Sequence, residues 1–137
     1  MKKAKRSVLE PRVAILLIGH GSRSPEAARV LQAAAASLKH RYRRHIVETA
    51  FFEIVPPDVP TGIDRCVAQG ATRLLLVPFS PYLDGHVGRD LPDHIINART
   101  RHAGIDIRIA AHLGPDPRLV AICADRVRQG LRAGRWE

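Results

Sequence analysis

Short apolar runs alternate with longer amphipathic stretches along this chain. Residues 13–18 are six consecutive apolar residues, and residues 72–77 contain a similar run; both are typical of strands buried on both faces of a parallel sheet. Residues 46–53 predict a further strand. Residues 105–109 alternate isoleucine with charged residues, which predicts a half-exposed edge strand.

Each predicted strand is followed by a predicted helix. The first helix starts at Ser24-Pro25-Glu26, because a serine cap, a proline at the first helical position and an acidic first turn favour a helix N-terminus. The second helix is expected to end at Gly70. The third follows a long loop over residues 78–92, is capped by Asp90 or a neighbour, and ends at Gly104.

A fourth helix is predicted to start at Asp116-Pro117 and to pack one apolar side on the sheet. The residues expected on that buried side are Leu119, Val120, Cys123, Val127 and Leu131. Cys66 takes an apolar position of the second helix. Both cysteines are therefore expected to be buried thiols rather than a disulfide or a metal site.

This alternation over 137 residues predicts an α/β fold: a single domain with a four-stranded, mostly parallel sheet and helices on both faces. Right-handed crossovers favour the flavodoxin-like strand order 2-1-3-4. The domain is expected to span residues 13–133, between a basic N-terminal tail over residues 1–12 and a frayed C-terminus over residues 134–137.

Three chemically active side chains lie at the carboxyl ends of predicted strands. His20 follows the first strand, Glu53 ends the second, and His86 lies in the loop after the third. In the order 2-1-3-4 these strands are neighbours about 4.8 Å apart, so the side chains converge where open α/β sheets bind ligands. Two imidazoles and a carboxylate suit a divalent first-row metal ion and leave coordination positions open.

Other site motifs fit the residues around His20 less well. A hydrolase nucleophile elbow has glycine where His20 and Ser24 stand, and a dinucleotide fingerprint has glycine in place of Ser24. The Gly-Lys-Ser/Thr of a phosphate loop does not occur in the sequence. A generic anion site at the N-terminus of the first helix, using Ser22 and Arg23, stays open.

Charge and composition bear on the partners. Twenty-two Lys and Arg against thirteen Asp and Glu give a formal net charge of +9, which should attract nucleic acid or a small molecule with many carboxylates. The few aromatic residues do not interleave with the basic ones as in a base-stacking surface. Apolar runs fall far short of the ~20 residues that span a bilayer, and the basic N-terminus lacks a signal-peptide core. We therefore expect a cytoplasmic protein.

Four segments carry a family resemblance. They are Leu-Ile-Gly-His-Gly-Ser-Arg at residues 17–23, Phe-Phe-Glu at 51–53, Val-Pro at 77–78 followed by Gly-His-Val-Gly-Arg-Asp-Leu-Pro at 85–92, and Ala-His-Leu-Gly at 111–114. In this order they resemble the sirohydrochlorin chelatases, the class II tetrapyrrole chelatases of the small single-domain cobaltochelatase or ferrochelatase type. The resemblance covers nearly the whole chain, from about Val13 to Leu119.

The resemblance implies a lyase that inserts a divalent metal ion into sirohydrochlorin, on the way to cobalamin or sirohaem. Co2+ is the first expectation, with Fe2+ or Ni2+ as alternatives. His20 and His86 are implied to bind the metal and to form the catalytic set with Glu53. The residues expected to bind substrate are Ser22, Arg23 and Arg89. The metal is a substrate, and no permanently bound cofactor is expected.

Two positions depart from the family pattern. Gly85 directly precedes His86, where the family commonly has one residue between them, and Asp116 stands where many relatives carry histidine. Neither departure removes an implied ligand. Because longer relatives hold two such domains face to face, a homodimer is the expected active form, with no nucleic-acid or membrane partner. The alternative function is a non-catalytic metal or tetrapyrrole carrier on the same fold.

Overall fold

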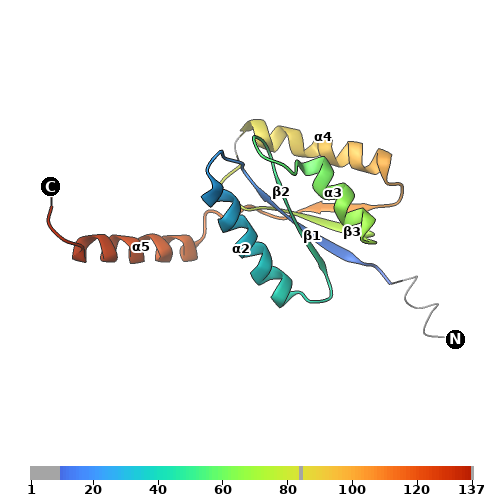
Figure 1. Cartoon of the computed structure of the whole chain (residues 1–137). Coiled ribbons are helices and arrows are strands. Elements are labelled where there is room, and N and C mark those ends of the chain that lie inside the picture. The colour runs from blue at the N-terminus through green and yellow to red at the C-terminus, as the bar shows by residue number, and fades with distance from the viewer. Residues whose placement is uncertain (1–9, 84, 137) are drawn as a thin grey trace.

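The computed structural model describes residues 10–83 and 85–136, without the side chains of His86 and Val87. Strands and helices alternate from end to end (Figure 1). In chain order the elements are β1 (Val13–Gly19), α2 (Pro25–Arg41), β2 (Ile46–Phe51), α3 (Val59–Ala68), β3 (Arg73–Pro78), α4 (Gly85–Arg101), β4 (Asp106–Ile109) and α5 (Pro117–Arg132).

The four strands form one parallel sheet in the order β2-β1-β3-β4. The predicted fold class and strand order are therefore confirmed. β1 is central, and its Ala14 pairs with Ile46 of β2 on one side and with Leu74 of β3 on the other. All strands point the same way, so their C-terminal ends lie along one side of the sheet, which is called the carboxyl edge below.

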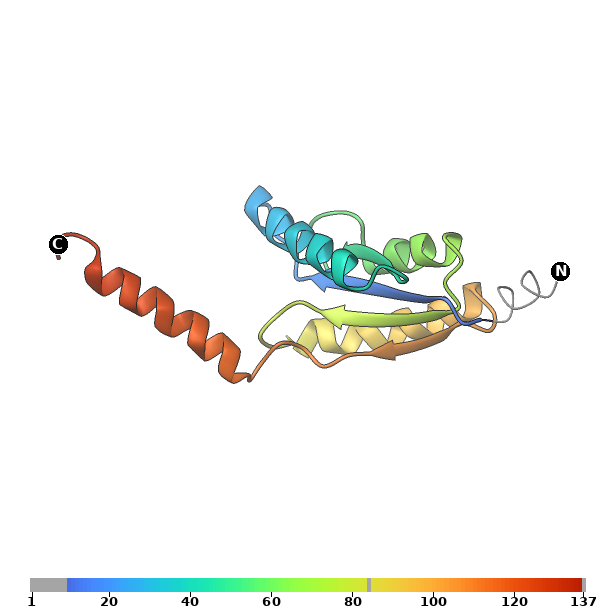
Figure 2. The ribbon, with the colours of Figure 1, turned by 90° about the horizontal axis from the view of Figure 1, so that it is seen from below.

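The two faces of the sheet are covered unequally. The larger apolar cluster lies under α3 and α4 and includes Leu16 of β1, Ile63 of α3 and Leu91 of α4. The smaller cluster lies under α2, and its buried members are Leu17, Leu31 and Phe51. Viewed from the α2 side, no helix among residues 10–83 and 85–136 lies in front of β3 and β4 (Figure 2).

The expected packing of the last helix is wrong. α5 has no buried residue, and it extends away from the sheet instead of lying on it (Figure 1). Cys123, expected to be buried, is exposed on this helix. The apolar spacing correctly predicted an amphipathic helix, but spacing alone does not determine which surface covers its apolar side.

The third helix begins earlier than the sequence suggested. α4 starts at Gly85, so the predicted loop over residues 78–92 is shorter and Asp90 lies within the helix instead of capping it. Pro92 is also inside α4. The sequence placed the helix start at a cap near Asp90, and Pro92 fits the first turn of such a helix. The segment that carries the second histidine is therefore helical.

The remaining predictions from the sequence concern Cys66 and the chain termini. Cys66 is buried as expected, and burial raises the pKa of its thiol to about 12. Residues 1–9 of the predicted tail lie outside the described residues, and the domain boundaries stay a prediction. Within the described ranges, no helix is long and apolar enough to cross a membrane.

Candidate functional site

His20 directly follows β1, and a close backbone contact holds it at the carboxyl edge. The next residue, Gly21, has a φ of +106°, in a region that favours glycine. A Cβ on Gly21 would lie only 1.9 Å from the carbonyl oxygen of Glu53. The loop that carries His20 can therefore approach Glu53 this closely only because residue 21 has no side chain.

Hydrogen bonds extend the β1–β2 pairing past the strand ends to His20 and Glu53. The N–H of Phe52 donates to the carbonyl of Gly19 at 3.0 Å, and the N–H of Glu53 donates to the carbonyl of His20 at 3.2 Å. The two side chains also meet, with Nε2 of His20 lying 3.3 Å from Oε1 of Glu53. Each is 47% exposed, so a ligand can reach the pair from solvent.

The chain turns sharply after Glu53, and a cavity opens beside the turn. The N–H of Val55 donates to the carbonyl of Glu53 at 2.8 Å, around Ile54, which has a φ of +73°. This conformation is unusual for a β-branched residue, and such strain tends to cluster at functional sites. The cavity measures about 350 Å³ and is lined by residues 53–58 with Thr61 and Arg65 of α3. Glu53 therefore faces His20 and also borders an open space.

His86 is the second residue of α4, and its side chain lies outside the described residues. The end of β3 that precedes it is held next to the end of β1, because the N–H of Phe79 donates to the carbonyl of Ile18 at 2.8 Å. Among the described residues, no group of three or more His, Cys, Asp or Glu is placed to hold a metal ion. The structure brings His20 and Glu53 together, and the convergence of His86 with them stays a prediction.

Comparison with known proteins assigns this sheet and its loops to one family. The CbiX family model matches residues 14–130, which include the His20 loop, Glu53 and most of α5. This chain belongs to the CbiX family. The resemblance to sirohydrochlorin chelatases is thereby confirmed at the level of the family.

Relatives of this CbiX chain include proteins of similar length and proteins about twice as long. It is 30% identical over 115 residues to a sirohydrochlorin ferrochelatase of Bacillus subtilis (strain 168) and 32% identical over 117 residues to the chloroplastic enzyme of Arabidopsis thaliana. These matches cover 84% and 85% of this chain but only 44% and 52% of the relatives, so the chain spans about half their length. A sirohydrochlorin cobaltochelatase of Methanothermobacter thermautotrophicus is 27% identical, with 89% of this chain and 95% of the relative covered.

Solved structures give the same assignment. The sirohydrochlorin chelatase SirB from Bacillus subtilis subspecies spizizenii, in complex with cobalt, superposes with a TM-score of 0.78 at 31% identity, covering 86% of this chain and 50% of SirB. A putative cobalamin biosynthesis CbiX protein from Marinobacter aquaeolei VT8 superposes with a TM-score of 0.70 at 26% identity, covering 87% and 97%. The fold of this CbiX chain therefore occurs both alone and as half of a longer protein.

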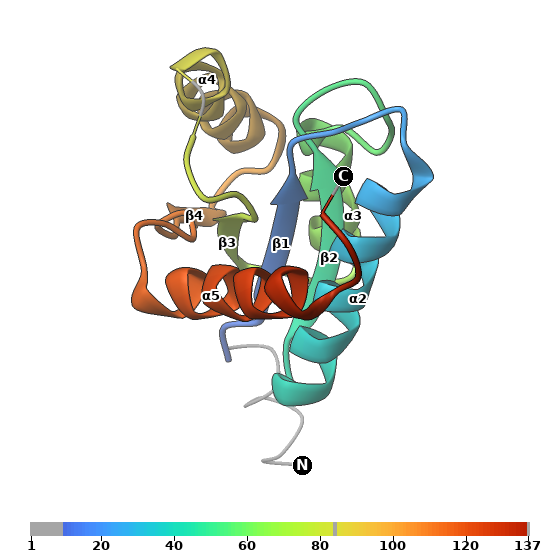
Figure 3. The same ribbon diagram turned by 90° about the vertical axis from the view of Figure 1, so that its left-hand side faces the viewer.

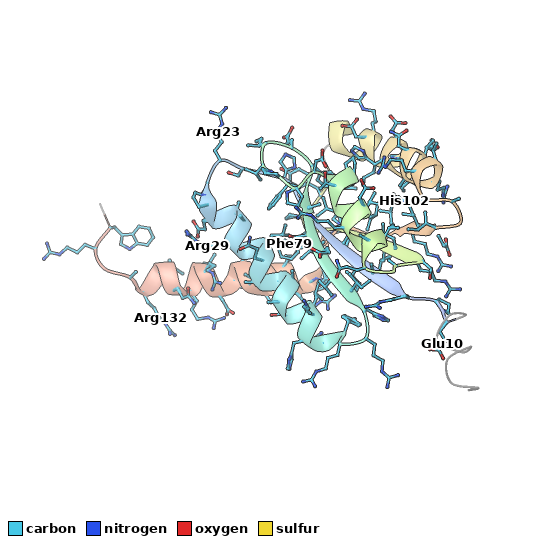
Figure 4. The ribbon with its side chains drawn as sticks, turned by 45° about the vertical axis from the view of Figure 1, so that its right-hand side comes forward. Glu10, Arg23, Arg29, Phe79, His102 and Arg132 are labelled. Atoms are coloured by element: carbon cyan, nitrogen blue, oxygen red, sulfur yellow. The ribbon has the colours of Figure 1, made fainter. Side chains whose placement is uncertain are left out.

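The predicted substrate-binding residues of this CbiX chain are spread around the carboxyl edge. The hydroxyl oxygen of Ser22 accepts from the N–H of Ser24 at 3.1 Å, so it shapes the turn before α2. Arg23 extends away from the body of the protein (Figure 4). Nε of Arg89 donates to the carbonyl of Gly85 at 3.0 Å within α4. Within the described part of the chain, none of the three forms a hydrogen bond or ion pair with the side chains of His20 and Glu53, and their roles stay predictions.

A third histidine, outside the predicted catalytic set, also lies at this edge. His112 follows β4, and its Nδ1 is buried without a hydrogen-bond partner among the described residues. The N–H of the next residue, Leu113, donates to the carbonyl of Ser80 at 2.8 Å, which holds this segment against the loop after β3. The position of His112 after a predicted strand could have marked it as a candidate site residue, since His20 was identified in the same way.

Proposed function

We propose that this chain catalyses the insertion of a divalent metal ion into sirohydrochlorin. Co2+ is the first candidate, with Fe2+ and Ni2+ as alternatives, and a cytoplasmic reaction on the way to cobalamin or sirohaem is part of the proposal. The observation that carries it is the half-exposed His20–Glu53 pair at the carboxyl edge of a CbiX chain. The sirohydrochlorin ferrochelatases and cobaltochelatases among the relatives support the substrate and the reaction type.

Metal insertion sets two requirements on a protein site. The incoming ion must be bound weakly enough to leave, and two pyrrole N–H protons of the macrocycle must be accepted as the ion binds the ring nitrogens. An imidazole with solvent on one side satisfies the first requirement, because imidazole suits first-row divalent ions and an incomplete ligand set keeps the ion exchangeable. A carboxylate within hydrogen-bond reach of that imidazole satisfies the second.

The geometry divides these roles between the two side chains. When the Nε2 proton of His20 points to Glu53, the lone pair of Nδ1 is available to the metal substrate, and Glu53 fixes the ring in that orientation. After the ion moves to the macrocycle, His20 is free to take one of the two pyrrole protons, and Glu53 accepts the other. His86 completes the proposed metal-binding set from the start of α4.

The basic composition fits a substrate with many carboxylates. The net charge of +9 raises the local concentration of such an anion. Arg23, in the loop after His20, and Arg89, in α4, are the proposed carboxylate partners, and Ser22 lies just before the N-terminus of α2, where anions are stabilised. A homodimer is the proposed active form, because this chain spans about half of the longer chelatases it matches.

The test is the anaerobic absorbance of sirohydrochlorin mixed with Co2+, Fe2+ or Ni2+ and protein. Wild type, His20→Ala and Glu53→Gln are compared with His40→Ala, a matched control in the last turn of α2. We expect wild type and His40→Ala to convert the metal-free spectrum faster than the spontaneous reaction. We expect His20→Ala to lose this acceleration and Glu53→Gln to lose most of it.

Two results would separate the alternatives. If wild type matches the spontaneous rate with every ion but still binds the metallated product in equilibrium dialysis, the non-catalytic carrier replaces the chelatase. If binding to a nucleic-acid oligomer falls steeply with salt and is the same in His20→Ala, while no tetrapyrrole binds, both readings fail. If wild type does accelerate insertion, its relative rates with the three ions rank the metals.

A further inference from the structure

His112 keeps one ring nitrogen inside the protein and leaves the other accessible. Nδ1 is buried without a hydrogen-bond partner among the described residues, although the side chain as a whole is only half-buried. Nδ1 lies beside the bond that attaches the ring, whereas Nε2 lies at its outer end. In this described ring only Nδ1 is both buried and unpartnered, so Nε2 is the nitrogen that a ligand can reach.

The burial of Nδ1 determines where the ring carries its proton. A neutral imidazole has one N–H donor and one lone pair, which can exchange places between its two nitrogens. A buried N–H without an acceptor is rare in proteins, and a buried acceptor without a donor is less so. The ring of His112 therefore keeps the lone pair on Nδ1 and carries the proton on Nε2. Its outer end is a hydrogen-bond donor.

Main-chain contacts on the C-terminal side of His112 hold this donor in place. The N–H of Leu113 donates to the carbonyl of Ser80 at 2.8 Å. A Cβ on Gly114 would lie 2.4 Å from the carbonyl oxygen of Pro81, so the two backbones are in contact there. The segment after β4 is thus attached to the loop after β3 before any ligand arrives, which lowers the entropy cost of binding.

The strand register places His112 and His20 at the same level of the sheet. Leu76 of β3 pairs with Leu16 of β1 on one side and with Ile109 of β4 on the other. His20 lies four residues beyond Leu16, and His112 lies three residues beyond Ile109. Both histidines therefore lie at the carboxyl edge. β3 lies between β1 and β4 (Figure 3), so two strand spacings, roughly 10 Å, separate the two chain segments.

This offset suits the rim of a tetrapyrrole. In the proposed function the metal ion passes from His20 to the ring nitrogens at the centre of the macrocycle, and the carboxylates lie on its rim. A side chain beside His20, such as Glu53, meets the centre, whereas one that is two strands away meets the rim. A carboxylate forms strong hydrogen bonds because it is charged. It is therefore the group of this substrate that a fixed N–H donor recognises.

We propose that the Nε2–H of His112 donates a hydrogen bond to one carboxylate of the tetrapyrrole. This inference rests on the proposed function, which supplies the substrate, and it adds a substrate-binding residue to the site. A metal ion needs a lone pair that faces outward, and in this tautomer the lone pair of His112 faces inward. His112 thus contacts the rim of the substrate, and His20 acts with Glu53 at its centre.

The first experiment determines the tautomer by NMR on the full chain labelled with nitrogen-15 in its histidines. Long-range correlations between ring protons and ring nitrogens distinguish a protonated nitrogen from an unprotonated one. The signals of His112 are those that disappear in His112→Gln. We expect the proton on Nε2. A proton on Nδ1 would overturn the proposal.

The second experiment measures the binding of metal-free sirohydrochlorin, and separately of Co2+ alone, by equilibrium titration. His112→Leu fills the same space without a donor, and His112→Gln keeps an N–H donor at the end of the side chain. We expect His112→Leu to bind sirohydrochlorin about ten- to a hundredfold more weakly, the value of a hydrogen bond to a charged group, and His112→Gln to recover most of this loss. The matched control is His40→Leu, in the last turn of α2, which should bind like wild type. All variants should bind Co2+ as wild type does, and equal sirohydrochlorin affinity of His112→Leu and wild type would overturn the proposal.

Melting temperatures separate a binding role of His112 from a structural one. His112→Leu removes the buried nitrogen that has no partner, and such groups destabilise a native protein. We therefore expect this variant to melt at or above the temperature of wild type while it binds sirohydrochlorin more weakly. If it instead melts earlier and loses Co2+ and sirohydrochlorin together, His112 only supports the fold and the proposal is wrong.

The failures of the two proposals are distinguishable. Sirohydrochlorin that binds through His112 but is never metallated faster than spontaneously would remove the proposed function and leave this inference standing. Accelerated insertion with an unchanged KM in His112→Leu would do the reverse. A wild type that binds no sirohydrochlorin would overturn both.

Discussion

Replacing Gly21 with alanine is expected to separate His20 from Glu53 without touching either side chain. The added Cβ would lie 1.9 Å from the carbonyl oxygen of Glu53, whereas a carbon–oxygen contact settles at about 3.3 Å. The two backbones must therefore move apart by about 1.4 Å, the difference between these distances. No other rearrangement relieves the overlap, because the contacted atom belongs to the main chain.

The free-energy cost of this movement has two parts. The hydrogen bond from the N–H of Glu53 to the carbonyl of His20, 3.2 Å long, is lost, which removes about 1 kcal/mol. Alanine at the φ of +106° adds about 1–3 kcal/mol of backbone strain. Gly21→Ala should therefore lower the free energy of unfolding by about 2–4 kcal/mol. A displacement of this size at a reacting centre costs on the order of 100-fold in rate.

Urea unfolding followed by circular dichroism gives the first quantity, and the anaerobic sirohydrochlorin assay gives the second. Gly104→Ala is the matched control, because Gly104 also has a positive φ, +82°, but a Cβ there meets nothing within 4 Å. The control should lose about 1–3 kcal/mol from backbone strain and keep its rate. If Gly21→Ala is as active as Gly104→Ala, the close approach does not position the pair and the reasoning is wrong.

Three further substitutions test other parts of the fold. Burial disfavours the charged form of Asp64, but the hydrogen bond to His102, 2.6 Å long, helps to hold its pKa below the ordinary 3.8. The stabilisation from this carboxylate is thus present above pH 3.8 and lost as the pH falls through the lower folded pKa. Because Asp64 is half exposed, Asp64→Asn should cost only about 0.5–1 kcal/mol in urea unfolding at pH 7, and an equal cost at pH 2 would contradict this. Gly62→Ala would place a Cβ 2.9 Å from Cδ1 of Leu16, and the overpacking should lower the melting temperature by the equivalent of about 1–3 kcal/mol; unchanged melting would show that α3 shifts freely. In Cys123→Ser protein the remaining thiol, Cys66, should react with Ellman's reagent only after unfolding, because burial raises its pKa to about 12; rapid reaction of the native protein would contradict its burial.

The sheet was predictable from the sequence because the apolar run that marks a strand lies within the strand itself. The apolar run at residues 13–18 belongs to β1, which is buried on both faces, whereas the similar run before Pro78 belongs to β3, which is buried on one face and half-buried on the other. Strand order followed from the handedness of the crossovers. The approach of His20 to Glu53 followed from that order, because β1 and β2 are neighbours.

What the sequence did not predict depends on non-local contacts. The apolar positions of α5 were identified, but the spacing within a helix does not determine what packs against it, and the close approach of Gly114 to the backbone of Pro81, just before α5, has no sequence pattern of its own. The start of α4 at Gly85 was missed because Pro92 resembles a first-turn proline. The buried Nδ1 of His112 depends on how the segment after β4 lies against the loop after β3.

The strand register has a consequence for which length changes this domain tolerates. Gly19 pairs with Phe51, and the ladder continues directly to His20 and Glu53. The connection over residues 42–45 joins α2 to β2 at the opposite end of the strands, so inserted residues there extend a loop far from the pair. A single insertion between Phe51 and Glu53 instead turns the carboxylate to the other side of the sheet, because side chains alternate along a strand. Natural variants should therefore differ in length at one end of the sheet and keep a fixed count at the other.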